Sequence, residues 1–219
     1  MHILFDLDGT LTDSFPGISR CINHALVALD RSPAGETVLR GFTGRPLTTI
    51  FAALLASHDE ALIDRAVAAY RARFDTVGIF ENGLFPGIID ALGALRADGH
   101  GMQVVTAKPA IPARRVVAHF ALDAYVSGVH GPDLSDRTCD KAALVRAALA
   151  HADAVASDAV MVGDRAEDIA AARANGVRSV GVAWGYGARA EIVGAEADFL
   201  AETPTHLTEW IRDIARRSA

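Results

Sequence analysis

The chain has 219 residues, of which 51% are hydrophobic and 22% are charged, and its formal net charge is −6. This composition is typical of a folded protein, and the length suffices for one α/β core with an insertion or for two small domains. The acidic balance, without a basic stripe, argues against nucleic-acid binding. No apolar run approaches the roughly 20 residues that span a bilayer, so we expect no membrane-spanning segment.

Cysteine and lysine are both rare. Cys21 and Cys139 are too few for a disulfide framework or a zinc site, and the N-terminus lacks the basic segment of a signal peptide. We therefore expect reduced thiols and a cytoplasmic protein, either monomer or homodimer. Of the 21 basic residues only Lys108 and Lys141 are lysines. Lysine is favoured where a compact ammonium is required, although a composition bias would leave the same pattern.

In chain order, apolar runs rich in branched residues alternate with helical patterns. The predicted strands are Ile3–Leu7, Met102–Thr106, a weaker one near Tyr125–Val129, Val160–Gly163 and Val177–Val182. The helices predicted between and after them are Ile88–Ala97, Ala110–Phe120, Lys141–Ala150, Asp168–Ala174 and a terminal one from Pro204 to about Arg216. This alternation predicts an α/β fold with a doubly wound parallel sheet.

Residues 15–82 interrupt the alternation. They contain helical patterns and no convincing strand, and the predicted helices are Ile18–Leu29, Thr37–Gly41, Leu47–Leu55 and Glu60–Thr76. Turn-forming residues flank the stretch on both sides. It could pack on the sheet as an ordinary crossover, but nearly 70 residues is too long for one. We predict an all-helical domain, 15–82, inserted into a core formed by 1–14 and 83–219.

Polar residues follow several of the predicted strands. In open α/β sheets, ligands bind beyond the carboxyl ends of the strands, so these side chains should share one edge. Carboxylate oxygens without soft ligands suit Mg²⁺, and a phosphoryl group would account for the hydroxyl and the ammonium. The residues are Asp6, Asp8, Thr106, Lys141, Asp164 and Asp168.

The segments DLDGT, TAKP, a downstream lysine and GDRAED resemble, in order, the four motifs of the haloacid dehalogenase-like superfamily. The match runs from residue 6 to 168, and the helical insertion resembles that family's mobile cap. DSFPGI, GRPL, FPGI, AAARANGV and AWGYG resemble the phosphoglycolate phosphatase-like branch. The segment GPDLSDRTCDK departs from the best-known phosphoglycolate enzymes, which leaves the substrate open.

The resemblance implies a role for each matching residue. Asp6 would be the nucleophile that forms an aspartyl-phosphate, and Asp8 the general acid and base. Mg²⁺ would be held by Asp6, the backbone carbonyl of Asp8 and Asp164, with Asp168 as a ligand or as a residue that orients one. Thr106 would bind phosphoryl oxygens, and Lys141 would neutralise charge. The residues proposed to bind substrate are Thr106, Ala107, Lys108 and Arg45.

Simpler structural roles compete with some of these assignments. Asp164 could be only a helix N-cap and Asp168 a solvated acid of the first turn. Lys108 could be solvated at a helix start, and Arg45 could be an ordinary exposed loop residue. The segment Trp184–Gly187 would either shape the entrance of the site or form a structural turn.

These observations predict a Mg²⁺-dependent phosphatase that hydrolyses a small soluble phosphomonoester, with 2-phosphoglycolate as the first substrate to test. A 5′-nucleotidase and a sugar-phosphate phosphatase or mutase are alternatives on the same fold. A dehalogenase or phosphonate hydrolase is disfavoured, because neither uses the proton-transfer group that Asp8 supplies. From another class, a non-catalytic phosphate-binding regulator would retain the same fold.

Overall fold

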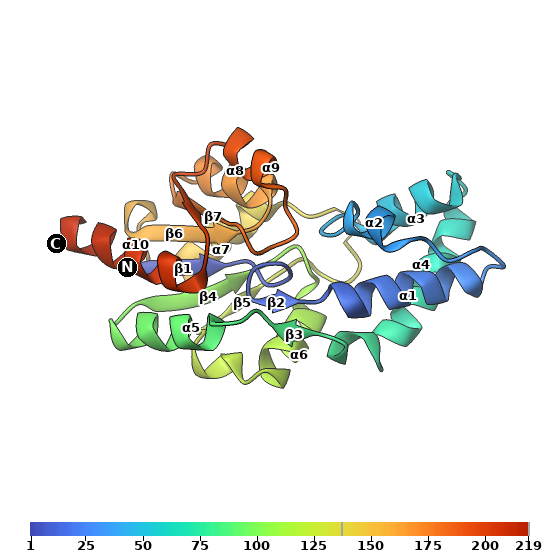
Figure 1. Ribbon diagram of the computed structural model, residues 1–219, viewed down its shortest axis with the longest axis horizontal. Coiled ribbons are helices and arrows are strands. Elements are labelled where there is room, and N and C mark those ends of the chain that lie inside the picture. Colours follow the sequence, from blue (N-terminus) through green and yellow to red (C-terminus); the bar gives the residue numbers. More distant parts are fainter. Residues whose placement is uncertain (137, 219) are drawn as a thin grey trace. The chain divides into compact units, whose positions relative to one another are not determined.

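The computed structural model describes residues 1–136 and 138–218 of the chain (Figure 1). Contacts between residues divide the chain into two compact units. We call residues 1–13 with 84–219 the core unit, and residues 14–83 the inserted unit. The strands β2 (Thr12–Asp13) and β3 (Gly83–Leu84) pair in a two-stranded sheet where the chain passes from one unit to the other.

The core unit is built on a six-stranded parallel sheet, which confirms the predicted fold class. The strand order is β5-β4-β1-β6-β7-β8. The strands are β1 (His2–Phe5), β4 (Gly101–Val105), β5 (Val129–His130), β6 (Ala159–Gly163), β7 (Arg178–Val182) and β8 (Phe199–Ala201).

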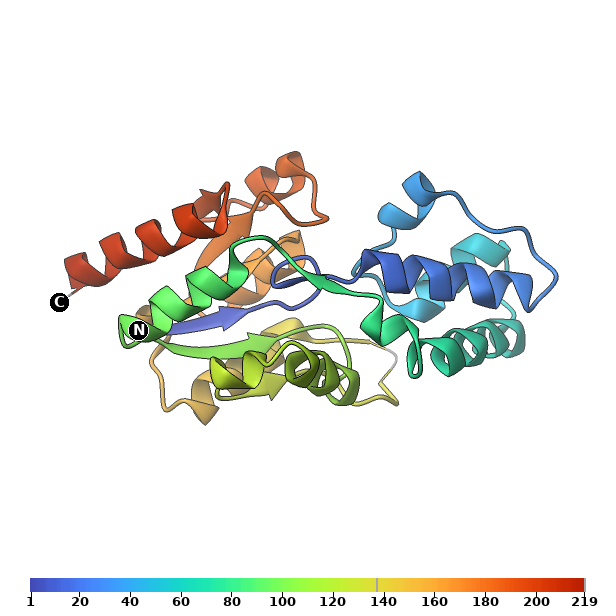
Figure 2. The ribbon, with the colours of Figure 1, turned by 60° about the horizontal axis from the view of Figure 1, so that its bottom comes forward.

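Helices cover both faces of this sheet. On one face α7 packs against α8, and α8 contacts α9 (Figure 2). α5 and α10 also pack together. An ion pair joins Arg212 of α10 to Asp98, which follows the last residue of α5. The helices are α5 (Ile88–Ala97), α6 (Ala110–His119), α7 (Lys141–His151), α8 (Ala166–Ala174), α9 (Arg189–Gly194) and α10 (Pro204–Ser218).

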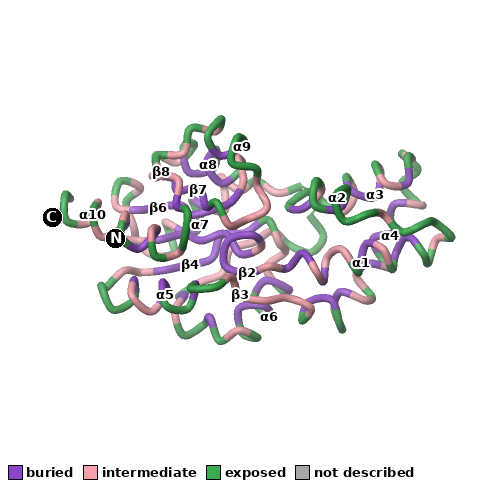
Figure 3. Tube along the Cα trace, viewed as in Figure 1, coloured by how far each residue is buried: buried purple, intermediate pink, exposed green. Residues whose placement is uncertain are grey.

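The central strand β1 is buried along most of its length (Figure 3). Leu4 packs with Val105 of β4 and Met161 of β6 against small residues of α7 and α8. Burial on both faces explains why β1, β4 and β6 appear in the sequence as nearly continuous apolar runs rather than as alternating ones.

The order of the strands determines where a ligand site can form. From β1 the chain proceeds to β4 and β5 on one side and then crosses to β6, β7 and β8 on the other. The topological switch point therefore lies beside the carboxyl end of β1, where crevices form in doubly wound sheets. Phe5 is in register with Val104 and Val162, so the segments that follow β1, β4 and β6 begin at the same edge.

Several short elements differ from the prediction. The weak strand expected near Tyr125–Val129 is shorter and lies at Val129–His130, and a 3₁₀ turn, Leu122–Ala124, precedes residues 125–128. β8, α9, β2 and β3 were not predicted. Their two to six residues are too few to show a periodicity of their own.

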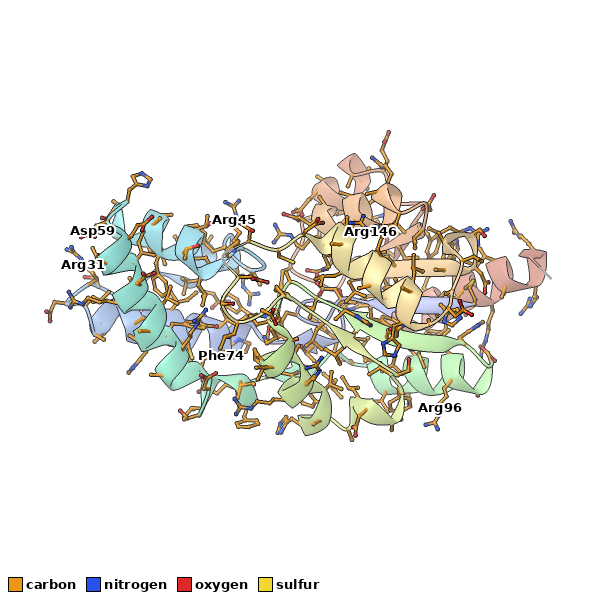
Figure 4. The ribbon with its side chains drawn as sticks, turned by 180° about the vertical axis from the view of Figure 1, so that it is seen from behind. Arg31, Arg45, Asp59, Phe74, Arg96 and Arg146 are labelled. Carbon is orange, nitrogen blue, oxygen red and sulfur yellow. The ribbon has the colours of Figure 1, made fainter. Side chains whose placement is uncertain are left out.

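The regular secondary structure of the inserted unit consists of helices, apart from the first residue of β3. Its helices are α1 (Phe15–Val27), α2 (Glu36–Arg40), α3 (Leu47–Leu55) and α4 (Glu60–Phe74), followed by a 3₁₀ turn, Gly78–Phe80. On α4, Asp59 caps the first turn by accepting a hydrogen bond from Ala61, and Phe74 at the last turn stacks on Tyr70 (Figure 4). α4 packs against α1 and α3, which gives this unit an apolar core of its own.

Among the described residues, no helix is both long and apolar enough to cross a bilayer. The cytoplasmic location and the monomeric or homodimeric state remain predictions.

Candidate active site

The turn that follows β1 is tightly built. The backbone N–H groups of Leu11 and Thr12 both donate to the carbonyl of Leu7, at 2.9 Å. Gly9 has a φ of +90°, and a Cβ added there would overlap the carboxylate of Asp164. Glycine is thus required both by the backbone conformation and by the close approach of an acidic side chain.

Three buried carboxylates meet at the carboxyl ends of β1 and β6. Asp6, Asp164 and Asp168 each offer an oxygen, and these oxygens lie within 4.8 Å of one another. Asp6 directly follows β1 and is 7% exposed, while Asp164 follows β6 and is 0% exposed. Asp168 lies in the first turn of α8 and is also 0% exposed. The structure thus brings together three of the residues that the sequence placed at this edge.

Lys141 provides the positive charge of this cluster. Its Nζ lies 3.1 Å from Oδ2 of Asp6 and forms a second ion pair with Oδ1 of Asp168. Lys141 is the first residue of α7, whose N-cap Asp140 accepts a hydrogen bond from the backbone of Ala143. The N-cap Asp140 thereby fixes the start of α7, and with it the direction from which the Lys141 side chain reaches the carboxylates.

The charges are strongly coupled in this buried position. Burial raises the pKa of Asp164 to about 7, and the negative charges of Asp168 and Asp6 add to the rise. The hydrogen bond from the backbone N–H of Tyr186 and the positive charge of Lys141 act in the opposite direction. Burial also raises the pKa of Asp168, against the effect of Lys141. For Lys141 burial alone would lower the pKa, but Asp168 and Asp6 hold it above its ordinary value. Burial is therefore the main reason that the pKa values of Asp164 and Asp168 lie above the ordinary value, and Lys141 offsets this effect only in part.

Asp8 is held by the other lysine. Nζ of Lys108 lies 2.6 Å from Oδ2 of Asp8, and the hydroxyl of Thr12 donates to Oδ1 at 3.5 Å. The Lys108 side chain is only 6% exposed, so it is not a solvated residue of a helix start. The two lysines of the chain thus pair with the two aspartates of DLDGT, one each.

The segment after β4 supplies the hydroxyl. Thr106 is buried, and its Oγ1 accepts a hydrogen bond from the backbone N–H of Lys108 at 3.2 Å. Ala107, between them, is exposed. Thr106 donates its own backbone N–H to His130, so the position of this segment is set by the edge strand β5.

Asp164 and Asp168 have neither of the simpler structural roles considered for them. The N-cap of α8 is Arg165, and Asp164 instead accepts hydrogen bonds from Thr10, Tyr186 and Gly187. Asp168 is not solvated; its Oδ2 accepts the backbone N–H of Arg165 at 3.0 Å, while Oδ1 faces Lys141.

One predicted residue belongs to the inserted unit. Arg45 belongs to the loop between α2 and α3 of the inserted unit (Figure 4), and its guanidinium lies 5.9 Å from the ring centroid of Phe42. Residue 137 of the segment GPDLSDRTCDK lies outside the described residues. Thr10, whose hydroxyl donates to Asp164 at 3.3 Å, was missed, although it belongs to the DLDGT motif.

The donor set fits a hard divalent cation. All three members of the cluster are carboxylates, and with Lys141 as their ion-pair partner they keep an excess of two negative charges when fully ionised. Oxygen donors at a buried site of this charge match what Mg²⁺ prefers, whereas zinc and copper favour sulfur or imidazole ligands.

Comparison with known proteins bears on the same residues. Residues 3–182 match the family described as haloacid dehalogenase-like hydrolase. A 5′-nucleotidase of Pseudomonas aeruginosa is 38% identical over 94% of this chain and 89% of that protein. The tyrosine-protein kinase PtkA of Mycobacterium tuberculosis is 33% identical over 93% of this chain and 66% of its own length. A phosphoglycolate phosphatase of Rhodospirillum rubrum is 33% identical over 84% of this chain and 80% of that protein.

Solved structures agree with the sequence relatives. The crystal structure of a predicted phosphatase from Clostridium acetobutylicum has a TM-score of 0.89 and 32% identity, covering 97% of this chain and 98% of that one. The chain therefore belongs to the haloacid dehalogenase-like hydrolases, and it is a phosphatase of that family.

Proposed function

We propose that this phosphatase is Mg²⁺-dependent and hydrolyses a small phosphomonoester through an aspartyl-phosphate on Asp6. The observation that carries the proposal is the buried cluster of Asp6, Asp164 and Asp168 with Lys141 against two of its carboxylates. Burying three carboxylates has a large desolvation cost, which a protein accepts where the site does chemistry.

The metal would be held by the carboxylates of Asp6 and Asp164 and the backbone carbonyl of Asp8, with Asp168 as a further ligand or as a residue that orients Lys141. When bound, Mg²⁺ would neutralise negative charge on these carboxylates and on the phosphoryl group of the substrate.

In the first half-reaction, an oxygen of Asp6 attacks phosphorus, and the bond from phosphorus to the leaving oxygen breaks. Asp8 donates a proton to that leaving oxygen, so an alcohol departs. Lys141 lies against Asp6 and reduces the repulsion between the attacking carboxylate and the phosphoryl oxygens. The hydroxyl of Thr106 would donate to one of these oxygens.

In the second half-reaction, Asp8 accepts a proton from water as the water oxygen attacks phosphorus. The bond between phosphorus and Asp6 breaks, inorganic phosphate leaves, and the aspartate is restored. Lys108, at 2.6 Å from Oδ2 of Asp8, would hold the side chain of Asp8 in one orientation through both half-reactions. Ala107 and Lys108 directly follow Thr106 in the chain, and we propose that they contact the substrate together with it.

The substrate class is the finer part of the proposal. Relatives named 5′-nucleotidase at 38% identity and phosphoglycolate phosphatase at 33% identity support two candidates. We place a nucleoside 5′-monophosphate first, because that relative has the higher identity and covers more of this chain, and 2-phosphoglycolate second. The inserted unit would act as the cap, with Arg45 meeting an anionic or polar group of the substrate.

The test is release of inorganic phosphate from a panel of nucleoside monophosphates, phosphoglycolate and sugar phosphates, with and without Mg²⁺. Wild-type protein should release phosphate only with Mg²⁺, and Asp6→Asn should remove this activity while the folded protein persists. Unchanged turnover by Asp6→Asn would exclude Asp6 as the nucleophile. Formation of an isomerised hexose phosphate without free phosphate would favour a sugar-phosphate mutase. Binding of a phosphorylated compound without any turnover would favour a non-catalytic regulator.

A further inference from the structure

The loop that follows β7 encloses Asp164. The backbone N–H of Tyr186 donates to Oδ2 of Asp164 at 2.8 Å, and that of Gly187 donates to the same oxygen at 3.3 Å. On the other side, the hydroxyl of Thr10 donates to Oδ1. Both oxygens of this buried carboxylate thus have a donor in a fixed place, which sets the rotation of the side chain.

Glycines allow this loop to come so close. A Cβ at Gly185 would overlap the Cβ of Asp164 and lie 2.5 Å from the backbone carbonyl oxygen of Gly9. One at Gly187 would overlap the backbone carbonyl of Asp164. The WGYG segment therefore packs its backbone, not its side chains, against the acidic residue.

Two side chains tie the same loop to the segment that follows β1. Nε1 of Trp184 donates to the carbonyl of Thr10 at 2.9 Å, and the hydroxyl of Tyr186 donates to Oδ1 of Asp13 at 2.9 Å. The Tyr186 ring also lies 6.4 Å from the ring of Phe85, centroid to centroid. All of these residues belong to the core unit.

The anchors lie at chemically meaningful points. Thr10 is part of the DLDGT turn, Asp13 is the last residue before the inserted unit, and Phe85 follows the return from it. The loop thus connects Asp164 to the DLDGT turn and to the core residues on either side of the inserted unit in the sequence.

We propose that Trp184–Gly187 is a positioning loop for the metal site: its N–H groups orient Asp164, and the Trp184 indole and Tyr186 hydroxyl hold those N–H groups in place. The inference rests on the proposed Mg²⁺ site. Mg²⁺ requires near-ideal octahedral geometry, so a ligand free to rotate binds it more weakly. Removing hydrogen bonds that orient metal ligands typically lowers metal affinity about 10- to 100-fold.

The experiment compares Trp184→Phe and Tyr186→Phe with two matched controls, Trp210→Phe on α10 and Tyr125→Phe beside β5. Each loop variant keeps an aromatic ring and removes one donor. Mg²⁺ affinity is measured by calorimetric titration of the folded protein well below its unfolding temperature, and independently as the Mg²⁺ concentration giving half-maximal phosphate release.

We expect both loop variants to bind Mg²⁺ about tenfold more weakly, with kcat at saturating Mg²⁺ near that of the wild type and with both controls unchanged. Loop variants with wild-type Mg²⁺ affinity would overturn the inference, whether or not their thermal stability falls. Controls that weaken Mg²⁺ binding equally would overturn it as well. If the wild type itself binds no Mg²⁺, it is the proposed function that fails, and this inference fails with it.

Discussion

Replacing Lys141 by methionine tests the electrostatics of the site most directly. The substitution keeps a chain of similar length and removes only the ammonium, which leaves Asp6, Asp164 and Asp168 facing one another in a buried place. At 3.1 Å from Asp6, and with an effective dielectric constant of about 20, the attraction to that one carboxylate is about 5 kcal/mol.

The net effect is smaller than the sum of the attractions, because burying the ammonium itself has a cost. Removing one partner of a buried ion pair usually costs about 3–5 kcal/mol. We expect Lys141→Met to lose about that much free energy of unfolding in EDTA, a large part of the roughly 5–15 kcal/mol of an ordinary domain. Mg²⁺ should restore much of the loss, since it replaces the missing positive charge.

The assay is urea unfolding in EDTA and in excess Mg²⁺, followed by circular dichroism. Lys108→Met is the matched control: it removes the other lysine, whose partner Asp8 is 17% exposed and can be hydrated again. That control should lose only about 1–3 kcal/mol and respond less to Mg²⁺. A Lys141→Met protein within about 1 kcal/mol of the wild type in EDTA would refute the reasoning, as would a loss that Mg²⁺ leaves unchanged.

Three further predictions concern the same site. Because burial raises the pKa of Asp164 to about 7, the metal-free folded state holds more protons than the unfolded state between the ordinary value of 3.8 and about 7, so its stability falls as pH rises through that window. Mg²⁺ competes with those protons, and the rise in Tm on adding it should be larger at about pH 8 than at about pH 5.5; an equal rise would contradict this. Gly9→Ala should destabilise the fold by about 1–3 kcal/mol and lower kcat at least tenfold, because residue 9 has a φ of +90° and an added Cβ would overlap Asp164. Calorimetry measures the stability and phosphate release measures kcat; wild-type values of both would contradict this prediction. Lys108→Gln should lower kcat more than it raises KM, because it frees the carboxylate of Asp8, whereas a change confined to KM would point to a substrate contact instead.

Much of the fold could be predicted from local patterns. The runs that became β1, β4, β6 and β7 are apolar because each strand is buried on both faces, and helix ends such as Asn175-Gly176 are recognisable by residue type. Edge strand β8 and helix α9 escaped prediction, since three to six residues carry no periodicity and their formation depends on neighbours already in place.

By itself, the sequence determined the order of strands and helices and the one edge at which Asp6, Thr106 and Asp164 gather, because parallel strands present their carboxyl ends together. Only the tertiary structure decided the pairing of charges: Lys141 with Asp6 and Asp168, and Lys108 with Asp8. The tertiary structure alone likewise decided the hydrogen bonds from the Trp184–Gly187 loop to Asp164. Such contacts join residues far apart in the chain, and their partners depend on burial and on the approach of whole elements, which no local pattern records.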